Sequence, residues 1–198
     1  MAHEAARSRI LQATVRTLAS QGYARTTARA IARTGGFAPG VIYYHFRDLE
    51  EVFVDTLRFT SRARLEQYRA ETGGVDTAVE LVRRLRILYA EDVEEGHIAA
   101  VQELVAAANA SSPLAERVRG ETAAWHDYAE GAIRMLVDGT PFAGHVPVAE
   151  LAETVVATYL GLEMLSHLGA GRLGPGGLLD AAEQWAALLD AFRSSIGG

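Results

Sequence analysis

Residues 26–46 read TTARAIARTGGFAPGVIYYHF, and this stretch decides the fold of the N-terminal part of the chain. It contains two short segments with helical spacing of apolar residues, separated by Gly35-Gly36. Tandem glycines favour a tight turn, because glycine adopts backbone conformations that other residues avoid. Pro39 lies where the first turn of the second segment begins, a position that tolerates the missing N–H. The stretch therefore predicts a helix-turn-helix.

The second short helix of this stretch has an inward and an outward side. Ile42 and Phe46 are four residues apart, so they face the core together. The side chains left largely outward are those of Gly40, Val41, Tyr43, Tyr44 and His45. A helix-turn-helix that presents a short helix to DNA requires this arrangement, and few other uses do.

Charge is divided unevenly along the chain. The 198 residues carry a formal net charge of −6. Residues 1–47 contain seven arginines and one acidic residue, a net charge of +6, so residues 48–198 carry −12. Attraction of the N-terminal part to phosphates would produce this division, and a chance distribution of surface charge is the alternative. All nineteen basic residues are arginine, which we attribute to genome composition.

The composition excludes several classes of protein. The chain has no cysteine, so it has no disulfide and no zinc-finger spacing. No apolar run approaches the roughly 18 residues of a membrane span, and the first residues lack the apolar segment of a signal peptide. There is no P-loop or nucleophile motif, and Glu163 and His167 lie four residues apart rather than the three of a di-iron bundle motif. We therefore expect a soluble, cytoplasmic protein that is not an enzyme and needs no cofactor or metal.

The whole chain predicts an all-α fold of about nine helices. It is rich in Ala, Leu, Glu and Arg, and no segment alternates apolar and polar residues as strands do. The predicted helices span residues 4–20, 27–34, 39–46, 48–70, 76–93, 98–109, 112–137, 148–168 and 178–195. We divide the chain into an N-terminal domain, residues 1–47, and a C-terminal helical domain, residues 48–198.

The N-terminal sequence resembles the TetR family, the tetracycline-repressor-like transcription regulators, most strongly over residues 7–57. The features that carry the resemblance are Gly22-Tyr23 after the first helix, Thr26-Thr27, Ile31-Ala32, Gly36, and the string GVIYYHF at 40–46. The resemblance implies a three-helix helix-turn-helix DNA-binding domain followed by a helical domain for ligand binding and dimerisation. The rest of the chain matches only as a long helical region.

The resemblance also implies how DNA is read. The second short helix enters the major groove of a double-stranded operator, where its N-terminal end meets base edges. The aromatic and imidazole side chains then contact phosphates and sugars, and the threonines offer a hydroxyl and a helix N-terminus to a phosphate. The DNA-binding residues implied in this way are Thr26, Thr27, Arg29, Pro39, Gly40, Val41, Tyr43, Tyr44, His45 and Arg47.

This chain departs from the family pattern at several of these positions. Ala38 stands where relatives commonly have Ser or Thr, so we expect the second short helix to lack a side-chain N-cap. Val41 replaces a common Thr, and Leu49 replaces a Lys that contacts phosphate. Base reading by Pro39 and Val41 would then be apolar, for instance against thymine methyl groups.

The resemblance places a ligand site among the helices of the C-terminal domain. The candidates are the polar and aromatic residues Tyr89, Glu103, Trp125, Tyr128, Tyr159, Glu163 and His167. Trp125 and Tyr128 are three residues apart and share a helix face, and Glu163 and His167 are spaced to pair. The expected effector is a small hydrophobic or aromatic molecule. Each candidate has a structural alternative, as core or as surface.

The last two predicted helices have more apolar surface than one core-facing stripe needs. The apolar residues that we assign to a dimer interface are Leu151, Val155, Leu162, Trp185, Leu188, Leu189 and Phe192. The solution typical of the family is a four-helix bundle across a twofold axis, and packing within one chain is the alternative. A homodimer presents two recognition helices, so the operator is expected to be palindromic.

The function predicted from the sequence is that of a ligand-responsive transcription regulator. A repressor released from its operator by the effector is the family's usual mode, and an activator of the same fold is an alternative. A second alternative is a helical ligand-binding or protein-interaction protein that has lost DNA binding, which Ala38, Pro39 and Leu49 favour. Coupling between the two sites is expected to run through the helix at 48–70.

Overall fold

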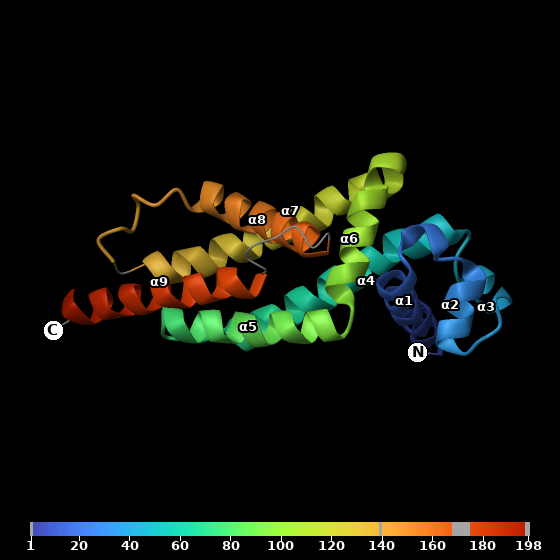
Figure 1. Cartoon of the computed structure of the whole chain (residues 1–198), viewed down its shortest axis with the longest axis horizontal. Helices are drawn as coiled ribbons and strands as arrows, with labels where there is room; N and C mark the ends of the chain where they lie inside the picture. The colour runs from blue at the N-terminus through green and yellow to red at the C-terminus, as the bar shows by residue number, and fades with distance from the viewer. Residues whose placement is uncertain (1, 139, 168–174, 197–198) are drawn as a thin grey trace. The chain divides into compact units, whose positions relative to one another are not determined.

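The computed structural model describes residues 2–138, 140–167 and 175–196, and all regular secondary structure within these ranges is helical. The α-helices are α1 (Ala2–Gln21), α2 (Ala28–Gly35), α3 (Gly40–His45), α4 (Leu49–Thr72), α5 (Ala78–Glu94), α6 (His97–Ala107), α7 (Ser112–Val137), α8 (Val148–His167) and α9 (Pro175–Ile196) (Figure 1). Two short 3₁₀ helices, η1 (Tyr23–Arg25) and η2 (Ala108–Ala110), follow α1 and α6. The predicted all-α fold is confirmed, with helix ends within about three residues of those expected.

The chain forms two compact units. Unit 1 comprises residues 1–64 and 91–121, and unit 2 comprises residues 65–90 and 122–198. The helices α4, α5 and α7 each contribute residues to both units. None of the described helices combines the length and the apolar character needed to cross a membrane.

The core of unit 1 is built in two layers. The first packs α1 against α2, α3 and the start of α4, and its buried side chains include Ile10, Leu11, Ile31, Ile42, Phe46 and Val52. The second packs α1 against α4, α6 and α7, through Val15, Leu18, Phe53, Leu57, Leu104 and Leu114. The apolar stripe predicted for the first helix therefore contributes to both layers, as does α4. Burial of these side chains fixes α2 and α3 on α1.

The helix-turn-helix forms as its sequence predicts. Thr27 caps α2, because its hydroxyl accepts a hydrogen bond from the N–H of Ala30 at 3.2 Å. Gly36 ends α2 in the left-handed conformation, with φ 66°, and its N–H donates to the carbonyl of Ala32. Glycine is required here, since a side chain at this φ is strained. The chain then reverses into α3, whose N-cap position is Pro39.

Unit 2 packs α9 against the part of α5 that belongs to this unit. Ala78 and Val82 of α5 are buried with Ala186 of α9, and Leu189 packs against them from its partly buried position. The carboxylate of Asp190 accepts hydrogen bonds from the N–H groups of Ala78 and Val79, at 2.9 and 3.0 Å. A side chain of α9 thus caps the N-terminus of α5 and satisfies two N–H groups that α5 itself leaves without acceptors.

Candidate nucleic-acid interface

The helix α3 buries one side and exposes the other. Ile42 is completely buried and Phe46, at the C-cap, is 2 % exposed, which confirms the predicted inward pair. Tyr44 is 80 % exposed and Tyr43 is 59 % exposed, an unusual state for side chains of this size. Their hydroxyls are therefore available to acceptors and donors outside the protein.

The N-terminal end of α3 is open. Ala38, Pro39 and Gly40 are all exposed, and no side chain caps the helix, as the replacement at Ala38 predicts. Nothing lies within 4 Å of the position that a Cβ would take at Gly40, so the backbone there is accessible to a bulky partner. Val41 is partly buried against the first core layer, which leaves only part of its side chain available.

The two threonines before α2 have different environments. Thr26 is buried, and its hydroxyl donates to the carbonyl of Gly22 at 2.7 Å. Thr27 is exposed at the N-terminus of α2, where its hydroxyl and the helix end both face outward. Of the two predicted phosphate contacts, Thr27 is the one whose hydroxyl solvent reaches. Thr26 holds the segment that precedes α2.

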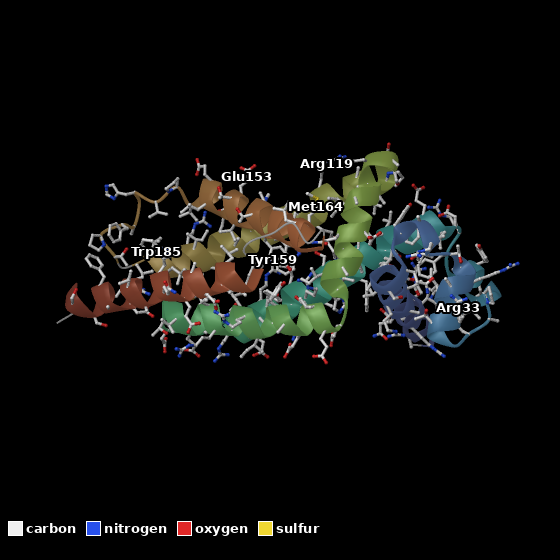
Figure 2. The ribbon with its side chains drawn as sticks, viewed as in Figure 1. Arg33, Arg119, Glu153, Tyr159, Met164 and Trp185 are labelled. Atoms are coloured by element: carbon white, nitrogen blue, oxygen red, sulfur yellow. The ribbon has the colours of Figure 1, made fainter. Side chains whose placement is uncertain are left out.

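Three of the seven arginines of residues 1–47 are exposed on α2 or directly after α3. Arg29 and Arg33 on α2 are exposed and make no ion pair with any described residue, so their charges are free to meet phosphates; Figure 2 labels Arg33. Arg47 is also exposed, and its Nε lies 3.2 Å from an oxygen of Glu51. The pKa of Glu51 is lowered, first because its carboxylate accepts the N–H of Arg47.

A second group of arginines is used inside the protein, and sequence reasoning had missed it. Arg7 on α1 donates to the carbonyl of His45 and pairs with Asp55 of α4. Arg9 donates to the carbonyls of Gly35 and Gly36, at 2.8 and 3.2 Å. No local sequence pattern signals these contacts, because their partners lie 26 to 48 residues further along the chain. The basic charge of the N-terminal part is therefore partly structural.

His45 lies partly buried at the C-terminal end of α3. Its ring packs edge-to-face with His3 at 4.5 Å and with Tyr44 at 5.0 Å between ring centroids. Burial, followed by the charges of His3 and Arg7, lowers the pKa of His45 below its ordinary value of 6.5. The imidazole is therefore neutral at neutral pH and offers a single N–H to a phosphate.

The predicted ligand residues do not all lie together. Trp125 and Tyr128 form an aromatic cluster with Tyr68, with ring centroids 5.2 to 5.9 Å apart and nearly perpendicular planes. The hydroxyl of Tyr128 lies 3.1 Å from that of Thr72, and burial raises the pKa of Tyr128. Sequence reasoning missed Tyr68, although it lies seven residues after Ser61 on the buried side of α4.

The other ligand candidates have different surroundings. Tyr89 and Tyr159 pack edge-to-face at 6.1 Å between centroids, also in unit 2. Glu103 belongs to unit 1, where its carboxylate accepts the N–H of Tyr23 at 2.6 Å, so it supports the start of η1. The side chains of Glu163 and His167 lie outside the described residues.

The residues assigned to the dimer interface are mostly exposed. Trp185 on α9 is 73 % exposed (Figure 2). The other exposed members of the set are Leu151, Val155, Leu188 and Phe192. Leu189 differs, because it packs against the core of unit 2, and the side chain of Leu162 lies outside the described residues. An apolar surface of this kind is typical of a face that binds another molecule.

Comparison with known proteins agrees with this geometry. The family model described as bacterial regulatory proteins, tetR family, matches residues 10–56. A comparison with curated proteins finds no match. Among solved structures, one named as a TetR-family transcriptional regulator from Rhodococcus sp. is 22% identical with a TM-score of 0.71, and covers 95% of this chain and 98% of its own. A TetR transcription regulator from Haloarcula marismortui is 17% identical with a TM-score of 0.73, covering 95% and 98%.

A third solved structure was determined with a ligand. It is a transcriptional regulator from Saccharomonospora viridis in complex with choline, 20% identical with a TM-score of 0.71, covering 96% of each chain. The fold and the exposed α3 define a helix-turn-helix protein. Residues 10–56 match the model of the TetR family of bacterial regulatory proteins, and the chain as a whole has the fold of the solved TetR-family transcriptional regulators.

Proposed function

We propose that this protein is a dimeric repressor that binds a palindromic DNA operator through α3 and leaves it when a small effector binds. The observation that carries the proposal is the exposed face of α3, where Tyr43 and Tyr44 stand outward. Arg29 and Arg33 of α2, in the same helix-turn-helix, are also exposed and make no ion pair with any described residue. Exposed hydroxyl donors and free guanidinium groups are the chemistry that positions a protein on phosphates. In functional terms, we assign DNA reading to residues 1–47 and effector binding and dimerisation to residues 48–198.

The position of these groups also suggests how bases are read. Pro39, Gly40 and Val41 form the N-terminal end of α3, which enters the major groove in helix-turn-helix proteins. None of these side chains donates a hydrogen bond, so base discrimination at this end is through apolar contacts and shape. Thr27, His45 and Arg47 supply further phosphate contacts around it.

Mobility shift with DNA from upstream of the gene tests this proposal. Tyr44→Ala and Arg29→Ala are each expected to weaken site-specific binding by about tenfold, because each removes one contact to the DNA. Arg62→Ala is the matched control, since Arg62 is an exposed arginine of unit 1 on α4, nearly four turns beyond the helix start. Unchanged affinity in both test variants, or an equal loss with Arg62→Ala, would remove α3 as the docking face.

The effector site that we propose lies at the aromatic cluster of unit 2. The rings of Tyr68, Trp125 and Tyr128 offer apolar faces with few polar groups, among them the Tyr128 hydroxyl beside Thr72, which suit a small hydrophobic or aromatic molecule. Aromatic faces also attract quaternary ammonium groups, and the similar regulator from Saccharomonospora viridis was solved with choline.

A fluorescence titration separates these two kinds of effector. The chain has two tryptophans, so Trp185→Phe leaves Trp125 as the single reporter. A panel of aromatic and aliphatic compounds is tested beside choline and its neutral isostere 3,3-dimethylbutan-1-ol. Binding of choline alone indicates a cation site, and equal binding of the isostere indicates an apolar one. If Tyr128→Ala leaves the affinity of every binding compound unchanged, the effector site is elsewhere.

Dimerisation would use the exposed apolar residues of α8 and α9. Leu151, Val155, Trp185, Leu188 and Phe192 leave water only if a second molecule covers them, and a second copy supplies the same surface in a twofold arrangement. A dimer presents two copies of α3, which is the physical reason for a palindromic operator. The protein then acts in the cytoplasm, where the dimer represses transcription by occupying a promoter.

A further inference from the structure

The orientation of α3 depends on support from outside the helix. Its six residues are too few for a helix that is stable alone, and no side chain caps its N-terminus. Ile42, the one buried residue of α3, and the buried C-cap residue Phe46 anchor one side. The orientation of α3 also depends on what holds its C-terminal end. The last carbonyl groups of a helix receive no hydrogen bond from N–H groups of the same helix.

Arg7 supplies that support. One terminal nitrogen of its guanidinium donates to the carbonyl of His45, the last residue of α3. The other terminal nitrogen pairs with the carboxylate of Asp55, in the second turn of α4. The guanidinium carbon also lies 4.1 Å from the ring centroid of Phe46, a cation–π contact with the C-cap residue. A single side chain thus joins α1, the end of α3 and α4.

The chemistry of these contacts requires arginine rather than any cation. The guanidinium is a planar fork whose nitrogens point in fixed directions, so it can meet the carbonyl and the carboxylate while its face covers a ring. The side chains of Arg7 and Asp55 are 27% and 25% exposed, and a partly buried pair is screened by salt less than a surface pair. A lysine would keep the charge and lose the geometry.

Two other arginines of α1 allow a comparison. Arg9 holds the turn before α3 through the carbonyls of Gly35 and Gly36, and so acts at the opposite end of that segment. Arg16 is exposed and pairs with no described acid, so its removal deletes the same charge from the same helix without breaking a contact.

We infer that Arg7 is a positioning residue for DNA recognition. It fixes the C-terminal end of α3 to Asp55 of α4, so that site-specific affinity depends on this link although the guanidinium faces the protein rather than the DNA. The inference rests on the proposed function of α3. It also makes Arg7 the point at which a displacement of α4 passes to the recognition helix.

Hydrogen exchange of the DNA-free protein is the first test. In Arg7→Lys and Arg7→Gln, the amides of residues 41–46 are expected to exchange about tenfold faster than in the wild type, because α3 opens locally when a charge-assisted hydrogen bond is lost. The amides of α6 report any general loss of stability, and Arg16→Gln is expected to change neither. Equal acceleration throughout unit 1, or none at 41–46, would show that Arg7 does not hold α3.

DNA binding is the second test, with a duplex that the wild-type protein selects from a randomised pool. Arg7→Lys is expected to lower affinity for this duplex about tenfold while its affinity for a scrambled duplex and the slope of log affinity against log salt stay unchanged. Asp55→Asn should act in the same direction, and the double variant should lose less than the sum of the two.

The outcomes distinguish the rival explanations. A phosphate contact by Arg7 would give a different pattern. Arg7→Lys would bind as the wild type does, whereas Arg7→Gln would bind both duplexes more weakly and its slope of log affinity against log salt would be smaller by about 0.9. That result would show that the inference is wrong. If the wild-type protein selects no duplex, the proposed function fails, and the exchange experiment alone decides whether Arg7 holds α3.

Discussion

The segment that carries the DNA-reading helix and the last two helices of the chain treat their apolar side chains in opposite ways. In residues 10–57, the large aliphatic residues of α1 to α4 are mostly buried within unit 1. In α8 and α9 of unit 2, the described residues that are fully buried are the small Ala152 and Ala186, whereas Trp185 and Leu188 are exposed. The first region completes its core within one chain, and the second leaves large apolar side chains in contact with water.

This difference suggests why similar proteins share more sequence in the helix-turn-helix than in the C-terminal helices. A helix-turn-helix must place a short helix at a fixed distance and angle to DNA, so its turn glycine, its caps and its buried residues are tied to one geometry. A helical bundle that binds an effector accepts many combinations of apolar side chains of similar volume. This accounts for a family model that covers residues 10–56, while the similarity of the whole fold reaches only 22% identity in the Rhodococcus structure.

The same substitution at a buried and an exposed isoleucine gives the largest expected contrast. Ile31→Ala, in the fully buried part of α2, should lower the free energy of unfolding by about 2–5 kcal/mol, because it leaves a cavity. Ile87→Ala, at a residue of α5 that is 59% exposed, should change it by less than about 0.5 kcal/mol. Urea unfolding followed by circular dichroism measures both values. Similar losses would mean that burial within unit 1 does not decide which isoleucine stabilises the fold.

A charge placed on the exposed face of α9 tests whether that face binds a second copy. Leu188→Glu should raise the dimer dissociation constant by about a hundredfold, since the new carboxylate would be buried without a partner. Ala187→Glu adds the same charge at an exposed neighbour on a different side of the helix, and should leave the dimer intact. Sedimentation equilibrium gives both constants. A wild-type protein that is monomeric at micromolar concentration would disprove the interface.

The two aspartates of α9 that contact α5 should differ in their effect on stability. Asp190→Ala removes the acceptor for two N–H groups at the start of α5, and should cost about 1–2 kcal/mol. Asp180→Ala breaks an exposed ion pair with Arg86, 2.7 Å long, which water and salt screen, so it should cost clearly less than Asp190→Ala. Chemical unfolding measures the two costs, and equal values would mean that capping from α9 does not stabilise unit 2.

The smallest expected effect is a dependence on pH at the end of α3. The pKa of His45 is lower in the folded protein than its ordinary value of 6.5, so the unfolded chain binds the proton more readily. As the pH falls through 6.5, this residue should lower the stability of the wild type, and His45→Gln should remove that contribution. Melting temperatures at pH 5.5 and 7.5 test the sign. A wild type that becomes relatively more stable at pH 5.5 would mean that the folded state favours the imidazolium.

Most of the fold could be predicted from the sequence, because local signals were strong. Thr27 caps α2, Gly36 takes a left-handed conformation, and Ile42 and Phe46 turn inward, each as its residue type and spacing indicate. The candidate site was harder. Thr26 and Thr27 are the same residue type at adjacent positions, so the sequence does not say which one faces solvent. In the folded chain Thr26 is buried and bonds to the carbonyl of Gly22.

The sequence by itself determined the all-helical architecture, the helix-turn-helix and the family model that residues 10–56 match. These features depend on periodicity, caps and glycine turns within a few residues of one another. Tertiary structure alone decided which charges are available. The local sequence does not distinguish Arg7 from Arg29. Arg7 bonds to the carbonyl of His45 and to Asp55, whereas Arg29 makes no ion pair with any described residue. The reason is physical: a partner 38 or 48 residues away leaves no local pattern, and only folding brings it within hydrogen-bonding distance.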